Sequence, residues 1–282
     1  MRQRKKRRRR ICAAGMVLFL LIMIFCAFDH GLVTRRYAVS SAKLKNTDPL
    51  RLVLLTDLHS CVYGDRQQTL YQRIERERPD LILLGGDIAD DVQPLEGALQ
   101  LVERIAGLAP CYYVPGSHDM WRADYEDVCQ RFASMGVTIL ENAVQPLEIR
   151  GQRIVLCGAI DPTVPFQDDP ARYGESLQAA FANLHPEDYN ILLAHRPDFI
   201  AQYASLGFDL VLSGHTHGGQ VRIPFLVNGL YAPGQGWFPR YAGGEYRVGE
   251  TDLIVSRGLS HFPRLPRIFN PPEVVVVNLA AK

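Results

Sequence analysis

The sequence has 282 residues, of which 47% are hydrophobic and 22% charged. This composition supports a buried core in one large domain or two small ones, and it excludes a globally disordered or fibrous chain. The formal charge is only +1, but residues 1–10 carry eight basic side chains, so the other 272 residues hold 23 basic and 30 acidic groups. An acidic body is unlike a general nucleic-acid binder, and we expect no nucleic-acid partner.

The N-terminus has the pattern of a membrane anchor. Ile11 to Phe28 is a run of 18 residues without a charge. A helix of that length spans roughly 27 Å, close to the hydrocarbon thickness of a bilayer. We predict a basic cytoplasmic tail over 1–10 and a transmembrane signal anchor over 11–33, giving a single-pass cell-membrane protein with its body outside the cytoplasm. A cleaved signal peptide and a twin-arginine signal remain alternatives.

The body alternates apolar strands with amphipathic helices. Residues 34–50 are polar and are predicted to be a linker, and residues 51–282 are predicted to be the catalytic domain. The principal apolar strands are expected at 51–57, 81–87, 111–119, 191–195 and 209–217. Helices are expected at 66–78, 94–107, 122–135, 172–183 and 197–205. This alternation, with continuous apolar strands, predicts sheets covered by helices.

Polar motifs directly follow five of these strands. They are Asp57-Leu58-His59, Gly86-Asp87-Ile88-Ala89-Asp90, Gly116-Ser117-His118-Asp119, Ala194-His195 and Gly214-His215-Thr216-His217. Ligands of open α/β sheets bind beyond the carboxyl ends of the strands, so these side chains are expected to meet. Five of the eight histidines fall in these motifs, which makes scattered core or surface histidines a poor explanation.

The mixture of imidazole and carboxylate groups predicts a transition-metal site. Such ligands suit Mn, Fe or Zn, and the motifs contain no thiolate of the kind that closed structural zinc sites use. Six or more ligands exceed what one tetrahedral ion needs, so two divalent metal ions sharing a carboxylate are expected. Two adjacent dications attract anions and activate water, which is the chemistry of phosphoester hydrolysis.

The five motifs resemble those of the calcineurin-like metallophosphoesterase superfamily. That family has D-x-H, G-D-x-x-D, G-N-H-D/E, a lone His and G-H-x-H in the same order. The stretches GHTHGGQVRIP and VSRGLS are most similar to its bacterial membrane-anchored branch. The resemblance implies an α/β fold in which two packed mixed β-sheets are flanked by helices in a four-layer sandwich, behind one N-terminal transmembrane helix.

The resemblance also implies roles for individual residues. Asp57, His59 and His217 would hold the first metal, His195 and His215 the second, and Asp87 would bridge them. His118 would act as general acid or transition-state stabiliser, with Asp90 orienting its ring. The family's second-metal Asn ligand is replaced here by Ser117, a shorter and weaker ligand. For Asp91 and Asp119, surface solvation or backbone capping is as good an explanation as a role in the site.

The expected activity is dinuclear metal-dependent hydrolysis of phosphodiester or pyrophosphate bonds by metal-bound hydroxide at the membrane surface. A lipid-linked phosphoester is one expected substrate. One alternative is a hydrolase of a nucleotide-linked acylated sugar, a pyrophosphatase of the UDP-diacylglucosamine type. The other is a metal-binding membrane module without turnover, which the replacement at Ser117 suggests. The oligomeric state is left open.

The serine in the third motif gives a test. Ser117→Asn would restore an amide oxygen at this position and should tighten binding of the second metal ion. Metal titration of the purified protein measures this directly. An unchanged titration curve would count against Ser117 lying among the ligands.

Overall fold

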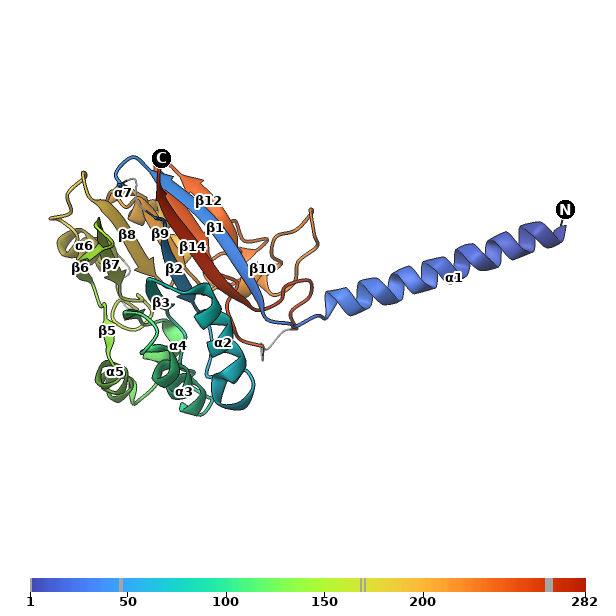
Figure 1. Ribbon diagram of the computed structural model, residues 1–282, viewed down its shortest axis with the longest axis horizontal. Coiled ribbons are helices and arrows are strands. Elements are labelled where there is room, and N and C mark those ends of the chain that lie inside the picture. The colour runs from blue at the N-terminus through green and yellow to red at the C-terminus, as the bar shows by residue number, and fades with distance from the viewer. Residues whose placement is uncertain (1, 46–47, 168, 170, 262–265) are drawn as a thin grey trace.

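A computed structural model describes residues 2–45, 48–167, 169, 171–261 and 266–282. Its body contains two six-stranded mixed sheets packed face to face, with helices on both outer faces (Figure 1). This is the predicted four-layer α/β architecture, so the predicted fold class is confirmed.

The first sheet has the strand order β1-β14-β2-β3-β4-β5. Its strands are β1 (Val33–Ser41), β14 (Glu273–Ala281), β2 (Leu50–Leu55), β3 (Leu81–Gly85), β4 (Cys111–Val114) and β5 (Val137–Ile139). β2 to β5 are parallel, and β14 runs antiparallel to β2. The central strands are apolar along their length because both faces of this sheet are covered.

The second sheet has the strand order β12-β13-β9-β8-β7-β6. Its strands are β12 (Gly244–Val248), β13 (Thr251–Val255), β9 (Leu210–Ser213), β8 (Tyr189–Ala194), β7 (Gln152–Ala159) and β6 (Ala143–Ile149). The four central strands are parallel, and the two edge strands are antiparallel to their neighbours. A two-stranded ribbon, β10 (Tyr231–Ala232) with β11 (Gly236–Trp237), lies outside both sheets.

Amphipathic helices cover the two outer faces. They are α2 (Gln68–Glu77), α3 (Glu96–Ile105), α5 (Tyr125–Ser134), α6 (Ala171–Ala180) and α7 (Ile200–Ser205). Leu70 and Ile74, one turn apart on α2, are fully buried against the first sheet, as the helical period requires. Tyr173 of α6 and Tyr203 of α7 are buried against the second sheet. A third apolar layer fills the space between the sheets and includes Leu52 and Ile191.

The first part of the predicted linker, residues 34–41, is a strand. Residues 33–41 form β1, which pairs in parallel with β14 over nine residues. The sequence hides this strand because its exposed edge carries polar side chains, including Arg35 and Arg36. Its inward residues still pack on the core between the sheets, where Val39 is buried. Residues 46 and 47 of the predicted linker lie outside the described residues.

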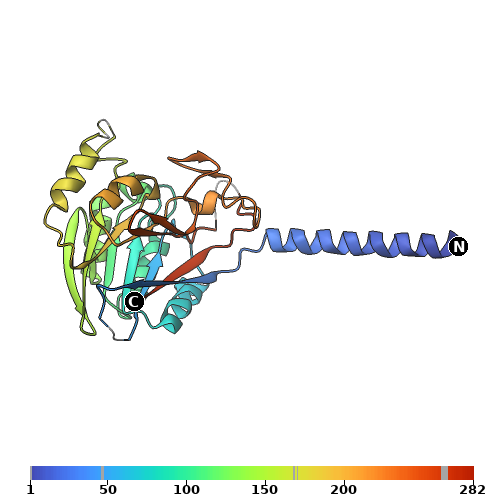
Figure 2. The ribbon, with the colours of Figure 1, turned by 90° about the horizontal axis from the view of Figure 1, so that it is seen from above.

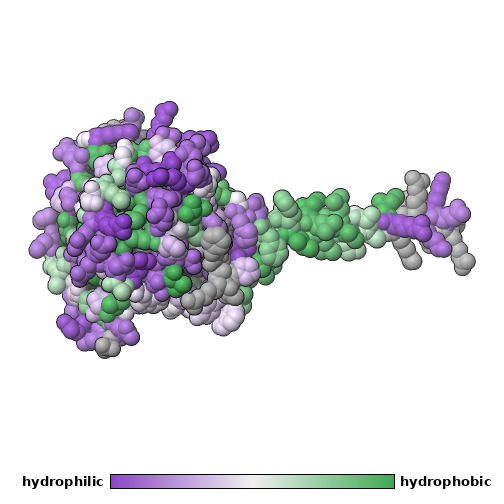
Figure 3. Space-filling view, turned by 90° about the horizontal axis from the view of Figure 1, so that it is seen from below, coloured by the Kyte–Doolittle hydropathy of each residue, from purple (hydrophilic) through white to green (hydrophobic). Residues whose placement is uncertain are grey.

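The N-terminal helix α1 (Arg2–Ala27) projects away from the domain as a single rod (Figure 2). Residues 10–27 are the one stretch of the described chain long and apolar enough to cross a membrane. Figure 3 shows this apolar band between a hydrophilic tip and the domain. Of the segment predicted as an anchor, 11–33, the helix covers residues 11–27, and β1 begins at Val33.

Paired substitutions on β1 test whether this strand is part of the folded domain. Val39→Asp places a carboxylate in the core between the sheets and should lower the free energy of unfolding by roughly 3–5 kcal/mol, the cost of an uncompensated buried charge. Ala38→Asp, on the exposed side of the same strand, should change it by about 0.5 kcal/mol or less. Urea unfolding of the full chain, followed by tryptophan fluorescence, measures both. If the two substitutions changed the free energy of unfolding equally, β1 would not be part of the folded core and would act only as a linker.

Candidate metal centre

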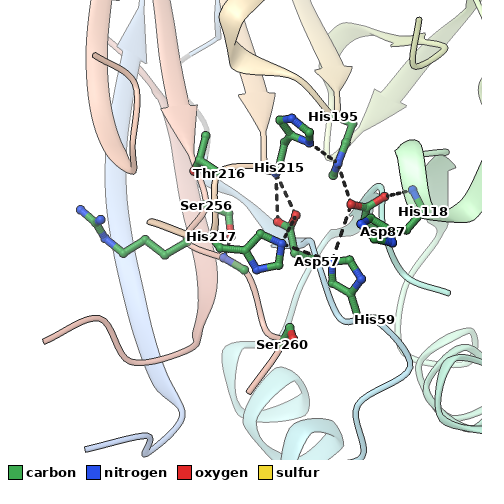
Figure 4. Close-up of polar contacts among 12 residues, drawn as sticks. Asp57, His59, Asp87, His118, His195, His215, Thr216, His217, Ser256 and Ser260 are labelled. Carbon is green, nitrogen blue, oxygen red and sulfur yellow. Dashed lines mark hydrogen bonds and ion pairs between the residues drawn. The ribbon is translucent and has the colours of Figure 1, made fainter. Parts of the chain in front are cut away.

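The polar motifs meet where parallel strands of the two sheets end. Asp57 follows β2, Asp87 follows β3, His195 follows β8 and His215 follows β9. Backbone hydrogen bonds join neighbouring strand ends, from the Asp57 amide to the Gly86 carbonyl at 2.9 Å within the first sheet. The layered fold therefore delivers side chains from both sheets to one place, where they point toward one another (Figure 4).

Eight of the nine predicted site residues fall into three groups, two of which share His59. The groups are Asp57, His59 and His217; Asp87, His195 and His215; and His59, Asp90 and His118. Within each group, one potential ligand atom per residue lies within 4.8 Å of the others. The ninth residue, Ser117, is buried in the first turn of the short helix α4 (Ser117–Met120), between Gly116 and His118.

Asp87 links the two sides of the cluster. Its Oδ2 atom lies 3.1 Å from His195 Nε2 and 3.6 Å from His59 Nε2. Its Oδ1 atom accepts a hydrogen bond of 2.8 Å from the His118 amide. Burial opposes ionisation of Asp87, but the neighbouring histidines hold its pKa well below the usual range. A buried carboxylate that stays charged between two histidines is suited to share cations with both.

Hydrogen bonds on the outer side of two rings aim the inner nitrogens. His195 Nδ1 donates to the Gly85 carbonyl at 2.9 Å, which leaves Nε2 facing Asp87. His59 Nδ1 bonds Asp90 Oδ2 at 2.7 Å, and its Nε2 faces the cluster. Metal-binding histidines are commonly oriented this way, by a carboxylate or carbonyl on the other ring nitrogen.

The inner nitrogens approach one another closely. The Nε2 atoms of His59 and His217 are 3.2 Å apart, and His195 Nε2 is 3.2 Å from His215 Nδ1. Burial, together with the neighbouring His195 and His59, lowers the pKa values of His215 and His217 well below the usual range, so both rings are neutral. Neutral imidazole nitrogens that face one another, with buried carboxylates nearby, can act as ligands of divalent cations.

The electrostatics of the cluster also fit metal ions at this place. Burial opposes protonation of His195, yet Asp87 raises its pKa to about 10, so the surrounding carboxylates favour a positive charge there. The donor set therefore fits the divalent metals that the sequence predicts.

The backbone at the cluster is held in an uncommon conformation. Five of the predicted metal ligands have a positive φ, between 47° and 70°: Asp57, His59, Asp87, His215 and His217. Asp and His tolerate this left-handed region better than most residues, but each still costs of order 1 kcal/mol or more. Such strain persists where the surrounding structure imposes it, and here it is concentrated at the predicted metal ligands.

The acid that orients His118 differs from the prediction. His118 Nδ1 bonds Asp91 Oδ1 at 2.6 Å, whereas Asp90 Oδ2 is 3.7 Å away. Asp90 instead bonds His59. Burial opposes ionisation of Asp90, but hydrogen bonds from His59 and two backbone amides outweigh it and lower its pKa to about 2. Because the two aspartates are adjacent, the spacing of the sequence motif could not show which of them contacts His118.

Sequence reasoning left the role of Asp119 open and missed that of Trp121. Asp119 is fully buried, and its carboxylate accepts hydrogen bonds from the amides of Ala89 at 2.7 Å and Gly116 at 2.9 Å. It therefore ties the loop after β3 to the loop after β4. Trp121 packs edge-on against His118, with ring centroids 4.8 Å apart. It lies outside the five polar motifs, so the sequence did not single it out.

A cavity of about 500 Å³ opens onto the cluster. His59, His118 and His217 line it, together with the aromatic side chains of Trp121 and Tyr231. A cavity of this size accommodates a small molecule. Exposed apolar side chains also surround it, among them Val92 and Trp237, which stacks on Tyr231 with ring centroids 5.5 Å apart.

The fold and the clustered ligands define a metal-dependent hydrolase of phosphoesters. Residues 50–219 match the family model of calcineurin-like phosphoesterases, and the chain belongs to this family. It is an enzyme of the metallophosphoesterase class, and members of this family use divalent metals.

Relatives share most of the chain. Phosphodiesterase YaeI of Escherichia coli is 30% identical over 83% of this chain and 83% of its own length. A zebrafish transmembrane protein with a metallophosphoesterase domain is 30% identical over 82% of this chain and 53% of its own length. Among solved structures, the phosphopantetheinyl hydrolase of Mycobacterium tuberculosis is similar, with a TM-score of 0.49 and 13% identity over 74% of this chain and 89% of that one.

Close packing around Asp87 gives a test of the centre. A Cβ atom added at Gly116 would lie 2.3 Å from Asp87 Oδ1 and 2.5 Å from the Asp87 amide nitrogen, so Gly116→Ala must displace the carboxylate. We expect metal affinity to fall by about 10–100-fold, as when a metal ligand loses its support.

Gly107→Ala is the matched control, because a Cβ there meets nothing within 4 Å. Metal content after dialysis against a graded chelator compares the two variants with the unchanged protein. Full retention of metal in Gly116→Ala would contradict the placement of Asp87 at the centre.

Proposed function

We propose that this protein hydrolyses phosphodiester or pyrophosphate bonds with two divalent metal ions bound at the cluster. The observation that carries the proposal is the position of Asp87, whose Oδ2 atom approaches a histidine on each side. Asp57, His59 and His217 would hold one ion, His195 and His215 the other, and Asp87 both. Ser117 would lie beside the second ion as a weak ligand or through a water.

When bound, the ions supply Lewis-acid stabilisation of the phosphoryl oxygens and an activated water. The protein residues orient the substrate and deliver the proton. His118 lines the cavity with its Nδ1 fixed by Asp91, so its Nε2 edge is left to meet the leaving-group oxygen. It would protonate that oxygen as the ester bond breaks. Trp121 limits rotation of the His118 ring from the other side.

The surroundings of the cavity favour a substrate with an apolar part. Exposed apolar side chains that line it, among them Val92, Trp121 and Tyr231, would contact such a group rather than a bare phosphate. The name of the Escherichia coli relative, a phosphodiesterase, supports diester over monoester chemistry. A lipid-linked phosphoester fits both features and a domain held close to a membrane.

We propose further that α1 crosses the cell membrane, with the basic residues 1–10 in the cytoplasm and the domain on the other side. The apolar helix and the excess of basic residues before it support this orientation. The zebrafish relative is also named a transmembrane protein.

Hydrolysis of an aryl phosphodiester by the manganese-loaded full chain tests the activity. His118→Ala should lower turnover by about 10²–10⁴-fold while metal content is retained, because it removes a proton donor and no ligand. Asp91→Asn should lower turnover less, because the ring remains but its orientation is lost.

His185→Ala, at an exposed histidine that does not line the cavity, is the control and should keep full activity. A metal-loaded, folded protein that leaves every phosphoester intact would favour the metal-binding module without turnover. Activity that survives both His118→Ala and Asp87→Asn would belong to another site.

A further inference from the structure

The body of the protein begins within a few residues of the apolar helix. Residues 28–32 join the end of α1 to β1. Ala27, the last residue of α1, accepts a hydrogen bond of 2.8 Å from the Phe269 amide, and the Val33 amide donates to the Pro272 carbonyl at 3.0 Å. Figure 1 shows α1 leaving the end of the domain where β1 and β14 start, opposite the C-terminus. This end is hereafter the anchor-proximal face.

An apolar turn lies on the anchor-proximal face. Val221 forms a parallel bridge with Ile268, the neighbour of Phe269, so the segment around it lies beside the end of α1. The next residues include Ile223, Phe225 and Leu226, which are 49%, 107% and 82% exposed. Exposing apolar side chains of this size to water is unfavourable unless they contact another surface. If α1 crosses a membrane as proposed, the surface next to this turn is that of the bilayer.

A pocket lined by basic residues lies beside this turn. Its volume is about 330 Å³, and it is lined by Arg35, Arg36, Tyr37, Arg222 and Arg257. Arg35 is the third residue of β1, and Arg222 directly precedes Ile223. Both positions are therefore close to the end of α1. The pocket is separate from the metal centre, and no metal-ligand residue lines it.

The arginines of the pocket are incompletely neutralised. Glu273 Oε2 lies 3.9 Å from the Nε atoms of both Arg35 and Arg257, while Arg36 pairs with Glu77 at 2.5 Å. Glu273 is therefore shared by Arg35 and Arg257, and among the described residues Arg222 has no ion pair. Arg257 also donates to Asn228 Oδ1 and to the Gly243 carbonyl, both at 2.8 Å.

Arg222 makes few contacts with the protein. Its Nε atom is buried and lacks a hydrogen-bond partner among the described residues, and its NH1 group reaches the Phe269 carbonyl at 3.5 Å. Burial, followed by the neighbouring Arg257, lowers the pKa of Arg222 to about 10. A bound anion would accept hydrogen bonds from Arg222 and relieve the repulsion among the arginines.

We infer that Arg35, Arg222 and Arg257 bind the phosphate of an anionic membrane phospholipid, with the turn at Ile223–Leu226 entering the interface beside it. Guanidinium groups match phosphate oxygens in geometry and charge. The inference rests on the proposed membrane position of α1 and is independent of the hydrolytic activity. A phospholipid is favoured over a soluble anion because the basic pocket, the exposed apolar turn and the end of the apolar helix lie together on one face.

Lipid binding to the full chain in detergent tests the inference. Phosphatidylglycerol is the probe, and native mass spectrometry gives the affinity of each bound lipid. Phosphatidylcholine and inorganic phosphate are the comparison ligands. The double variant Arg35→Gln/Arg222→Gln should weaken phosphatidylglycerol binding by about tenfold or more, because it removes two charge-assisted contacts.

Arg131→Gln is the matched control. It removes one exposed guanidinium on α5, where Asp127 is 3.9 Å away, and it should leave lipid affinity unchanged. This control also accounts for lipid attracted to the basic residues 1–10, which all variants retain. Hydrolysis of a soluble aryl phosphodiester should be equal in all variants, so loss of lipid binding and loss of catalysis are measured separately.

Three outcomes would overturn the inference. Equal phosphatidylglycerol affinity in the double variant and the control would show that the pocket binds no lipid. Equal affinity for phosphatidylcholine would remove the preference for an anionic headgroup. Displacement of phosphatidylglycerol by an equal concentration of inorganic phosphate would identify a soluble-anion site instead.

Discussion

The arrangement of the centre depends on a charged Asp87 carboxylate between histidines that come from different sheets. His59 follows a strand of the first sheet, and His195 follows a strand of the second. One carboxylate oxygen approaches both within 3.6 Å, which is possible only because the sheets pack with their strand ends together. Burial alone would protonate a carboxyl group here, so Asp87 and its histidines stabilise one another's charge.

The geometry of the centre requires backbone conformations and close contacts that lower local stability. Five predicted ligands have a left-handed backbone, and several glycines beside them, among them Gly86 and Gly116, leave no space for a Cβ. At Gly86, where φ is +89°, a Cβ would lie 2.4 Å from His195 Nδ1. At Gly116 it would meet Asp87. Strain and tight packing of this kind are sustained by the buried sheets on either side, which is why catalytic loops are found on rigid scaffolds.

The sequence sufficed for the fold class and the membership of the cluster, because buried strands and the polar residues that end them are local patterns. It failed where long-range contacts decide. β1 was missed because its pairing partner lies at the other end of the chain and its edge is polar. Asp90 and Asp91 are adjacent in sequence, and only the folded chain brings Asp91 to His118 and Asp90 to His59. Arg35 and Arg222 meet for the same long-range reason.

β1 changes how the proposed membrane anchor relates to the active site. A flexible linker of the predicted length would let the domain rotate and move far from the bilayer. Instead, residues 28–32 connect α1 to a strand that is bonded to β14 along its whole length. In the proposed membrane-anchored arrangement, the cavity would then sit at a fixed height and orientation above the lipid. The cavity lies near the anchor-proximal face, because Gln220 lines it and directly precedes Val221. A substrate held in the membrane would therefore lie close to the metal centre, which favours lipid-linked esters over soluble ones.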